Sequence, residues 1–210
     1  MVSIIIDDFE TDLSKWDSST NWALDSANPH AGTCAAKYNN VNPHNLGLNV
    51  SLTGGKYTFD FYYRVNYTLG NVDLLNLSLN SGMNYICVLQ KSNTALNYYD
   101  DTGTKQALPV PTAIAANTWY HIVIVLDFSD NSISWEVDGN SKGSINFTKD
   151  TWGETLDPYP PVANQIYFSG IGSSSISTYL DDVSITWESG VAGGSLVHLG
   201  RRVQKAILVR

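Results

Sequence analysis

The sequence predicts an all-β protein in which two antiparallel sheets pack as a jelly-roll sandwich, followed by a C-terminal extension. Apolar and polar residues alternate with a period of two over much of the chain, as half-buried strands require. The alternating runs are short and are separated by turns rich in Gly, Asn and Ser, which is typical of sandwiches and jelly rolls. Charged residues make up only 15% of the chain against 43% hydrophobic residues, a balance that excludes a disordered protein.

Strand-like alternation is clearest from Lys56 to Tyr67, where odd positions are apolar or aromatic and most even positions are polar. This pattern predicts a strand with one buried side and one solvent-facing side. Residues 119–128 are apolar on both sides, which predicts a strand in the middle of its sheet. Hairpin turns are expected at Ser129–Ser132 and Asp138-Gly139. The other expected strands span residues 75–80, 85–90, 133–137, 166–169 and 179–187.

The charge is unevenly distributed along the 210 residues, whose formal net charge is −8. Residues 7–188 contain 20 acidic and 8 basic side chains, a net charge of −12, whereas the last 22 residues contain four basic side chains and no acid. An acidic body repels phosphates, so a nucleic-acid binder is not expected. The chain also lacks an apolar run of about 18 residues, so no membrane span is expected.

The composition changes after Trp187, where Glu188–Ser195 has the Gly and Ser content of a flexible linker. The sequence therefore predicts a jelly-roll domain over residues 1–188 and, over residues 189–210, a Gly-rich linker with a basic and apolar C-terminal arm. The arm carries three cations in its middle and an apolar run at its end, which predicts docking on a neighbouring copy or a particle scaffold. The residues expected to make these contacts are Arg201, Arg202, Lys205, Ile207, Leu208 and Val209.

The first ten residues lack the basic start and apolar run of a signal peptide. Either a signal was removed and replaced by Met1, or the protein is made in the cytoplasm and works on a virion or outside the cell. The two cysteines, Cys34 and Cys87, leave a disulfide open, although two small buried apolar side chains are the favoured interpretation.

Three segments resemble the concanavalin A-like jelly rolls, in particular laminin-G-like and carbohydrate-binding modules. The first is Asp7-Asp8-Phe9-Glu10 with Leu13-Ser-Lys-Trp16, Trp22 and Pro29-His-Ala-Gly-Thr33. The second is Asn117-Thr-Trp-Tyr-His-Ile-Val123 leading to Trp135-Glu-Val-Asp-Gly139, and the third is Tyr179-Leu-Asp-Asp-Val-Ser-Ile185. The resemblance covers about residues 5–188 and implies that the N-terminal and C-terminal strands pair.

The resemblance also implies a structural calcium ion where those two strands meet. The positions that match the ligands of related carbohydrate-binding modules are Glu10, a backbone carbonyl near Thr33, and Asp182. Asp8 and Asp181 supply further carboxylate oxygens, the ligand type that Ca²⁺ prefers. The alternative is that these acids are separate, solvated loop residues.

A hydrolase is not expected from the carboxylates of this chain. Glycosidases of this fold resemble one another in a Glu-x-Asp-x-x-Glu strand, whose two Glu share one glycosidic bond. Glu136-Val-Asp138 begins that pattern, but Ser141 stands at the second Glu position. A lyase would need His and Tyr in one groove, and His121 and Tyr120 are adjacent residues that face opposite sides of a strand.

Carbohydrate or partner binding is expected from aromatic side chains outside the predicted core. Tyr62 and Arg64 lie on the polar side of their strand. Two segments without alternation, Ser92–Thr118 and Asp150–Asn164, are expected to be long loops, which in compact domains are often functional. Their candidate aromatics are Tyr98, Tyr99, Trp152 and Tyr159. Each of these aromatics could instead cover a sheet edge or lie in a protein interface.

Two functions fit these observations. The first is a non-catalytic, lectin-like structural or display protein carried in many copies by a larger assembly. The acidic body, the C-terminal arm and the missing signal peptide favour a bacteriophage capsid decoration or tail component that holds cell-surface glycans. The alternative is a carbohydrate-binding module of a secreted glycan-active enzyme or adhesin.

Overall fold

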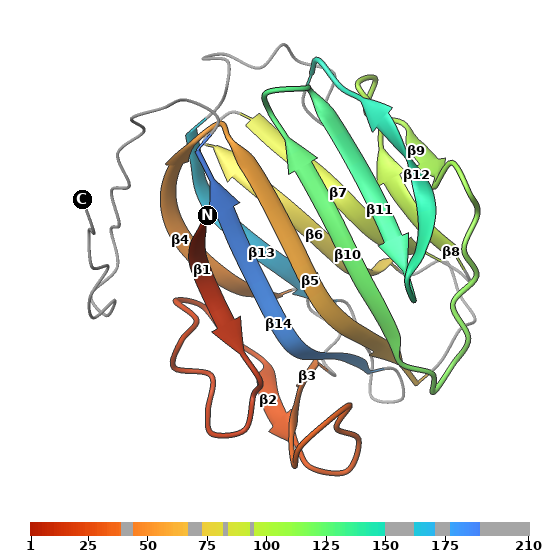
Figure 1. Ribbon diagram of the computed structural model, residues 1–210. Coiled ribbons are helices and arrows are strands. Elements are labelled where there is room, and N and C mark those ends of the chain that lie inside the picture. Colours follow the sequence, from red (N-terminus) through yellow and green to blue (C-terminus); the bar gives the residue numbers. More distant parts are fainter. Residues whose placement is uncertain are drawn as a thin grey trace.

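The computed structural model is an all-β sandwich of two antiparallel sheets (Figure 1). The structure describes residues 1–38, 44–66, 73–81, 84–92, 95–149, 162–170 and 177–189. These residues contain fourteen strands and no helix, which confirms the predicted fold class. Accordingly, no helix in this part of the chain is long and apolar enough to cross a membrane.

The first sheet contains eight strands in the order β12-β11-β10-β5-β14-β3-β2, and β1 also pairs with β14. Figure 1 shows β1 beside β14 at the edge of this sheet. The pairing of β1 with β14 brings the first and last described strands together, as the resemblance implied. The bounds are β1 (Val2–Asp7), β2 (Trp22–Asp25), β3 (Ala35–Tyr38), β5 (Lys56–Val65), β10 (Tyr120–Asp127), β11 (Ser132–Val137), β12 (Asn140–Asn146) and β14 (Thr178–Glu188).

The second sheet contains six strands in the order β4-β13-β6-β7-β8-β9. In Figure 1 it lies behind the first sheet. Its strands are β4 (His44–Thr53), β6 (Asp73–Ser81), β7 (Asn84–Ser92), β8 (Ala95–Tyr99), β9 (Lys105–Ala107) and β13 (Val162–Gly170).

The alternation in β5 determines which side of the first sheet faces the core. Its odd residues, Tyr57 to Val65, are completely buried, whereas its even residues are only partly buried. The same division holds in β10, where Ile122, Ile124 and Leu126 are buried and His121 is partly exposed. The even side of β5 and the His121 side of β10 therefore form one outer face, which is free to carry a site.

Strand β10 lies between β11 and β5, so its prediction as a central strand is confirmed. The Asp138-Gly139 hairpin is also confirmed, because both residues have positive φ, at 51° and 72°. This is the pattern of a type I′ turn. The structure corrects the long loop expected at Ser92–Thr118, because β8 and β9 lie within it and extend the second sheet. The prediction missed them because both strands are short, and because β9, the edge strand of this sheet, is exposed throughout and shows no buried side.

Two predicted features lie outside the described residues. These are residues 150–161 of the second expected loop and residues 190–210, which include the whole C-terminal arm. Within the described part, β14 ends at Glu188. The thiol of Cys34 is free.

Candidate functional site

Three aromatic rings form a column on the outer face, from β10 across β5 to the loop between β2 and β3. Tyr62 of β5 is the cross-strand partner of His121 in β10 and of Asp181 in β14. The His121 ring stacks on Tyr62 at a centroid distance of 4.7 Å and an interplanar angle of 19°. The His30 ring stacks on Tyr62 at a centroid distance of 3.4 Å and an interplanar angle of 16°. The backbone N–H of His30 donates a hydrogen bond to Asp181 of β14. Tyr62 therefore lies between two histidines.

Each histidine of the column is paired with its own carboxylate. His121 Nε2 lies 2.7 Å from Asp60 Oδ1, and His30 Nδ1 lies 2.9 Å from Asp182 Oδ2. Asp60 belongs to β5 and Asp182 to β14, so the sheet itself holds both imidazoles. The histidine side chains are about 30% exposed, at 27% for His30 and 31% for His121. The column is thus held from both ends and still reaches solvent.

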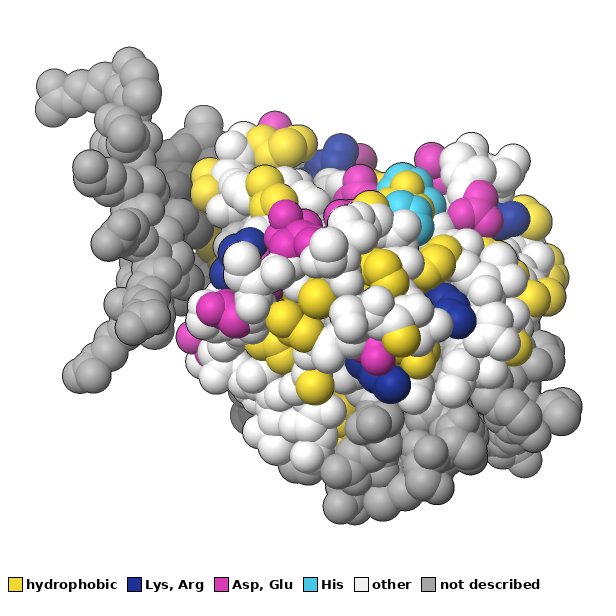
Figure 2. Space-filling model, turned by 90° about the horizontal axis from the view of Figure 1, so that it is seen from below, with side chains coloured by type: hydrophobic (Ala, Val, Ile, Leu, Met, Phe, Trp, Pro, Cys, Tyr) yellow, Lys and Arg dark blue, Asp and Glu magenta, His cyan; other side chains and the backbone are white. Residues whose placement is uncertain are grey.

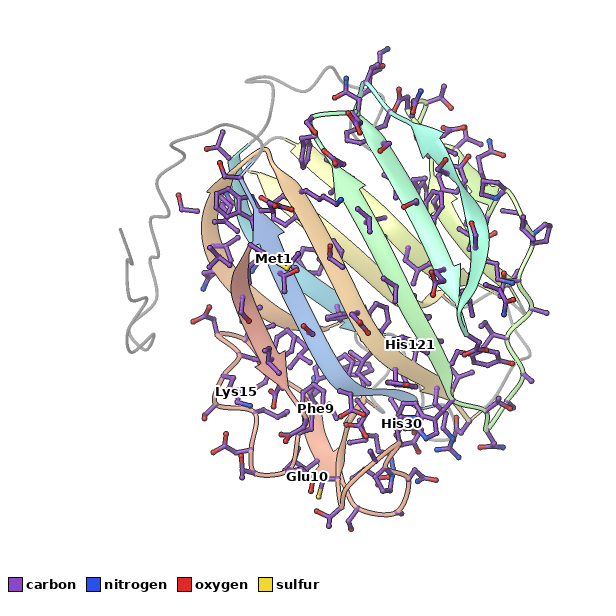
Figure 3. All side chains as sticks on the ribbon, viewed as in Figure 1. Met1, Phe9, Glu10, Lys15, His30 and His121 are labelled. Atoms are coloured by element: carbon purple, nitrogen blue, oxygen red, sulfur yellow. The ribbon has the colours of Figure 1, made fainter. Side chains whose placement is uncertain are left out.

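Figure 3 shows His30 and His121 near each other at the end of the first sheet. In Figure 2 the histidine atoms form one spot on the surface, bordered by hydrophobic and acidic side chains. His30 and His121 are the histidines whose side chains the structure describes, so no other histidine contributes to this spot.

Trp119 joins the column to a second group of side chains around Tyr179. Its ring meets His30 edge-on at 5.7 Å and Tyr179 edge-on at 6.4 Å. Arg64 lies over the Tyr179 ring, with its Cζ 4.9 Å from the centroid, and Lys37 Nζ lies 5.5 Å from the same centroid. Tyr179 is buried beneath these groups, whereas Trp119 remains partly exposed. We call the five rings of His30, Tyr62, Trp119, His121 and Tyr179 the outer-face patch.

The loop that carries His30 is held by two carboxylates that come from different parts of the chain. Asp181 Oδ2 accepts hydrogen bonds from the backbone N–H groups of His30 (2.8 Å) and Ala31 (3.4 Å). Glu10 accepts from the N–H and Oγ1 of Thr33 and from the N–H of Cys34, at 2.6 to 3.2 Å. The two ends of residues 30–34 are therefore fixed independently, and this places the His30 ring on Tyr62.

The surroundings shift the pKa of both carboxyl groups, in opposite directions. The hydrogen bonds from Thr33, together with the N–H of Cys34, hold the pKa of Glu10 below its usual value. Asp181 is buried, at 1% exposure, and burial raises its pKa against the lowering effect of its backbone hydrogen bonds. Burial disfavours the charged form, whereas hydrogen bonds to a carboxylate favour it.

The structure places most of the residues predicted to bind calcium at the two ends of the loop that carries His30. Glu10 and Thr33 contact each other directly at one end of the loop, and Asp181 and Asp182 hold its other end. Asp182 has a positive φ of 48° at an irregularity of β14, where the strand leaves its regular pairing with β5.

A calcium ion at this place would depend largely on backbone ligands. Within the described residues, no group of three or more His, Cys, Asp or Glu side chains could hold a metal ion. Besides Glu10 and Asp182, most of its ligands would have to be backbone carbonyls such as that near Thr33, and water. Ca²⁺ accepts such mixed oxygen sets, so the calcium site stays a prediction.

Two further acids of the N-terminal segment have local roles. Asp7 is buried and accepts hydrogen bonds from Trp16 Nε1 (2.7 Å), Lys15 Nζ (3.1 Å) and the N–H of Phe9 (3.1 Å). Asp8, a predicted calcium ligand, is exposed and accepts a long hydrogen bond from the N–H of Glu10 (3.4 Å). These contacts stabilise the turn after β1, which carries Glu10.

The predicted sugar-binding aromatics are distributed over different parts of the molecule. Tyr62 is in the outer-face patch, with Arg64 beside it, but both faces of the Tyr62 ring are covered by histidines. Tyr98 packs on Trp135 at 5.1 Å, next to the core. Tyr99 is the cross-strand partner of Lys105 at the β8–β9 edge. Trp152 and Tyr159 lie outside the described residues.

Sequence reasoning missed four members of the patch: His30, Trp119, His121 and Tyr179. His121 was compared with its neighbour Tyr120, although the aromatic residue that shares its face is Tyr62 on the next strand. Knowledge of the pairing of β5 with β10 would have revealed this contact, because its register places His121 opposite Tyr62. His30 gives no such signal, since hydrogen bonds to residues about 150 positions away hold it in place.

The hairpin of β11 and β12 carries the residues of the incomplete Glu-x-Asp-x-x-Glu pattern. Glu136 of β11 is the cross-strand partner of Ser141 in β12, so no second carboxylate faces it from that position. Asp138 forms the turn, and its Oδ1 accepts a hydrogen bond from the N–H of His121 (2.9 Å).

Comparison with known proteins identifies the family of this fold. The model of the concanavalin A-like lectin/glucanases superfamily matches residues 36–189. No curated protein sequence matches this chain.

Several solved structures share the fold at low sequence identity. A cellulose-induced protein, Cip1, is 18% identical with a TM-score of 0.63, over 87% of this chain and 96% of that chain. A carbohydrate esterase of the Shiga toxin-encoding bacteriophage phi24B is 12% identical with a TM-score of 0.65, over 90% and 98%. A sialidase is 14% identical with a TM-score of 0.55, and the match spans 89% of this chain but 19% of the sialidase. The chain belongs to the concanavalin A-like lectin/glucanases superfamily.

Proposed function

We propose that this protein is a non-catalytic carbohydrate-binding domain whose ligand contacts the outer-face patch. The observation that carries the proposal is the continuous set of five rings on one sheet face. Sugar rings present apolar C–H faces together with hydroxyl groups, so a binding site needs aromatic surface and polar groups side by side. Trp119 supplies partly exposed aromatic surface, and the two histidines, Asp60, Asp182 and Arg64 supply the polar groups.

The proposed binding mode differs from stacking on a single tyrosine. Because histidines cover both faces of Tyr62, the column presents ring edges, the Tyr62 hydroxyl and imidazole N–H groups to a ligand. Trp119 is then the residue most able to contact a sugar face directly. The rigid placement of the rings lowers the ordering cost of binding.

A binding role without catalysis is supported by the carboxylates of the site. Asp60 and Asp182 are each paired with a histidine, and Asp181 is buried and bonded to backbone N–H groups. None of these carboxylates belongs to the Glu-x-Asp-x-x-Glu pattern, in which Ser141 stands at the position of the second Glu. When the protein is incubated with a panel of polysaccharides, we expect no release of reducing ends or of unsaturated products.

We also propose a display role, which specifies the place where the domain binds its ligand. We infer that many copies are carried on the outside of a virus particle and are attached through residues 196–210. The order of cations and apolar residues in that arm supports this inference, as does the fold shared with a bacteriophage protein over almost its full length. The alternative, a module of a secreted glycan-active protein, is favoured by the fold shared with a cellulose-induced protein and with mucin-degrading O-glycanases.

Affinity electrophoresis in gels that contain single polysaccharides tests the binding function. The native chain should be retarded by at least one polysaccharide, and Trp119→Ala should lose that retardation. Thr58→Ala is the matched control, because Thr58 lies on the same face of β5 but outside the patch. Equal retardation of native protein and Trp119→Ala would place the ligand elsewhere.

A further inference from the structure

Arg64 is the cation beside the outer-face patch that has no anionic partner in the described part of the chain. Its Nη2 donates a hydrogen bond to Asn117 Oδ1 at 3.0 Å, and its guanidinium lies over Tyr179. Its Nη1 is buried and has no hydrogen-bond partner, whereas the bond from Nη2 to Asn117 is exposed, so a ligand would meet the guanidinium at Nη2.

The acidic groups around Arg64 are already engaged with other partners. Asp25 pairs with Lys37 at 3.3 Å, Asp60 with His121 at 2.7 Å, and Asp182 with His30 at 2.9 Å. Asp181 is buried and accepts backbone hydrogen bonds. Among the described residues, none of these carboxylates forms an ion pair with Arg64.

The contact with Arg64 also determines what Asn117 can offer to a ligand. The Asn117 oxygen accepts from the guanidinium, so its amide nitrogen is directed away from Arg64 and can only donate. Asn117 is exposed and has a positive φ of 59°, which Asn tolerates better than most residues. Its backbone N–H is bonded to Val65 O at 2.7 Å, which fixes its position next to the end of β5.

Arg64 Nη2 and Asn117 Nδ2 thus offer two donor groups and one positive charge at the border of an aromatic surface. A carboxylate only accepts hydrogen bonds, and a guanidinium matches it in geometry and charge. A sugar hydroxyl carries no charge, so it gains less than a carboxylate from the guanidinium. Trp119 connects this pair to the patch through its contact with Tyr179.

We propose that the carbohydrate ligand carries a carboxylate, as uronic and sialic acids do, and that Arg64 and Asn117 bind this group. The inference rests on the proposed function and names the class of sugar that the same site takes. One ring of the ligand lies against Trp119, and its carboxylate accepts hydrogen bonds from Arg64 Nη2 and from Asn117 Nδ2. The paired acids of the patch keep their own partners.

Titration calorimetry with matched ligands tests this proposal. The ligand pairs are sialyllactose with lactose, and oligogalacturonate with its neutral methyl ester. The native chain should bind the acidic member of at least one pair roughly tenfold more tightly. A sulfated oligosaccharide is the third arm, and equal binding of sulfate and carboxylate ligands would overturn the assignment of a carboxylate site.

Two variants distinguish the Arg64 pair from a general charge effect. Arg64→Lys keeps the positive charge but loses the planar guanidinium with its paired donors, so the preference for the acidic ligand of each pair should fall. Asn117→Asp replaces the donor with a second acceptor and gives Arg64 an anionic partner within the protein, so the preference should disappear. Aspartate also tolerates the backbone conformation of residue 117, and far-UV circular dichroism checks that both variants fold.

The outcomes separate this inference from the proposed function. Equal affinity for the two members of each pair would refute the acidic specificity and leave carbohydrate binding intact. An undiminished preference in Asn117→Asp would refute the role of the pair. Failure of the native chain to bind any member of either pair, together with failure in the polysaccharide gels, would refute both proposals.

Discussion

The carboxylate of Glu10 occupies the space that a side chain at position 32 would need. A Cβ atom built on Gly32 would overlap Glu10 Oε1, and Gly32 has a positive φ of 59°. The absence of a side chain at residue 32 therefore lets Glu10 reach the N–H groups of Thr33 and Cys34. Through these bonds, a residue of the N-terminal segment positions the loop that carries His30.

Gly32→Ala should weaken this attachment. The substitution strains the backbone at a positive φ and displaces the Glu10 carboxylate, so we expect a loss of stability of about 1–3 kcal/mol. Urea unfolding measures the effect. Gly139→Ala is the matched control, since Gly139 also has a positive φ but nothing lies within 4 Å of its Cβ position. A larger loss at Gly139 than at Gly32 would contradict the role given to Glu10.

Stability should decrease as the pH falls below about 4.5. The folded-state pKa of Glu10 is lowered from 4.5, and hydrogen bonds led by that from Thr102 lower the pKa of Asp100 to about 2. A carboxyl whose pKa is lower in the folded state adds stability above its unfolded pKa and loses it as the pH falls through the folded pKa. Asp181, with its raised pKa, acts in the opposite direction. Unfolding midpoints at pH 5 and pH 3 should therefore differ less in Glu10→Gln than in the native protein.

Calcium binding is tested by its linkage to stability. If Glu10, Asp182 and a carbonyl near Thr33 hold Ca²⁺ in the folded state, one hundred times Kd of calcium adds about 2.7 kcal/mol. EDTA should then lower the melting temperature, and Asp182→Ala should remove that sensitivity. An unchanged melting temperature with EDTA in the native protein would mean that the carboxylates work through the loop N–H groups alone.

The C-terminal arm should govern assembly and not folding. Deleting residues 196–210 should leave the circular dichroism and melting temperature unchanged but lower the oligomer mass or the occupancy on a particle. Ile207→Asp tests the apolar contact, and Arg201→Glu with Arg202→Glu tests the charges, whose effect salt should weaken. Light scattering gives the mass, and an unchanged mass after the deletion would contradict the assembly role.

Alternation allowed prediction of the fold but not the complete site. In β5 every buried residue could be assigned from its position in the strand, because burial of one face imposes a period of two, and Tyr62 falls on the outward face. In β10 the sequence is apolar on both sides, so alternation did not show that His121 faces outward. The contact between these two residues depends on which strands are neighbours, and local sequence does not encode this.

The position of His30 could not be predicted for a different reason. It depends on Asp181 and Asp182, which lie in β14 where the strand leaves its regular pairing with β5 between Asp181 and Ser184. A change of register alters which side each residue faces, so alternation fails where the site is built. The resemblance named Glu10, Thr33 and Asp182, which contact the two ends of the loop over residues 30–34, and its calcium ion stays a prediction.

The most direct test of carbohydrate binding at the outer-face patch is a proton NMR titration of the histidine rings. The chain has four histidines, whose Hε1 signals can be assigned with single His→Gln variants. The ligand is a fragment of a polysaccharide that retards the protein in the gel experiment. As it is added, the signals of His30 and His121 should shift saturably with one dissociation constant. The signals of His44 and His198 should not shift. Saturable binding without any shift at His30 and His121 would contradict the account.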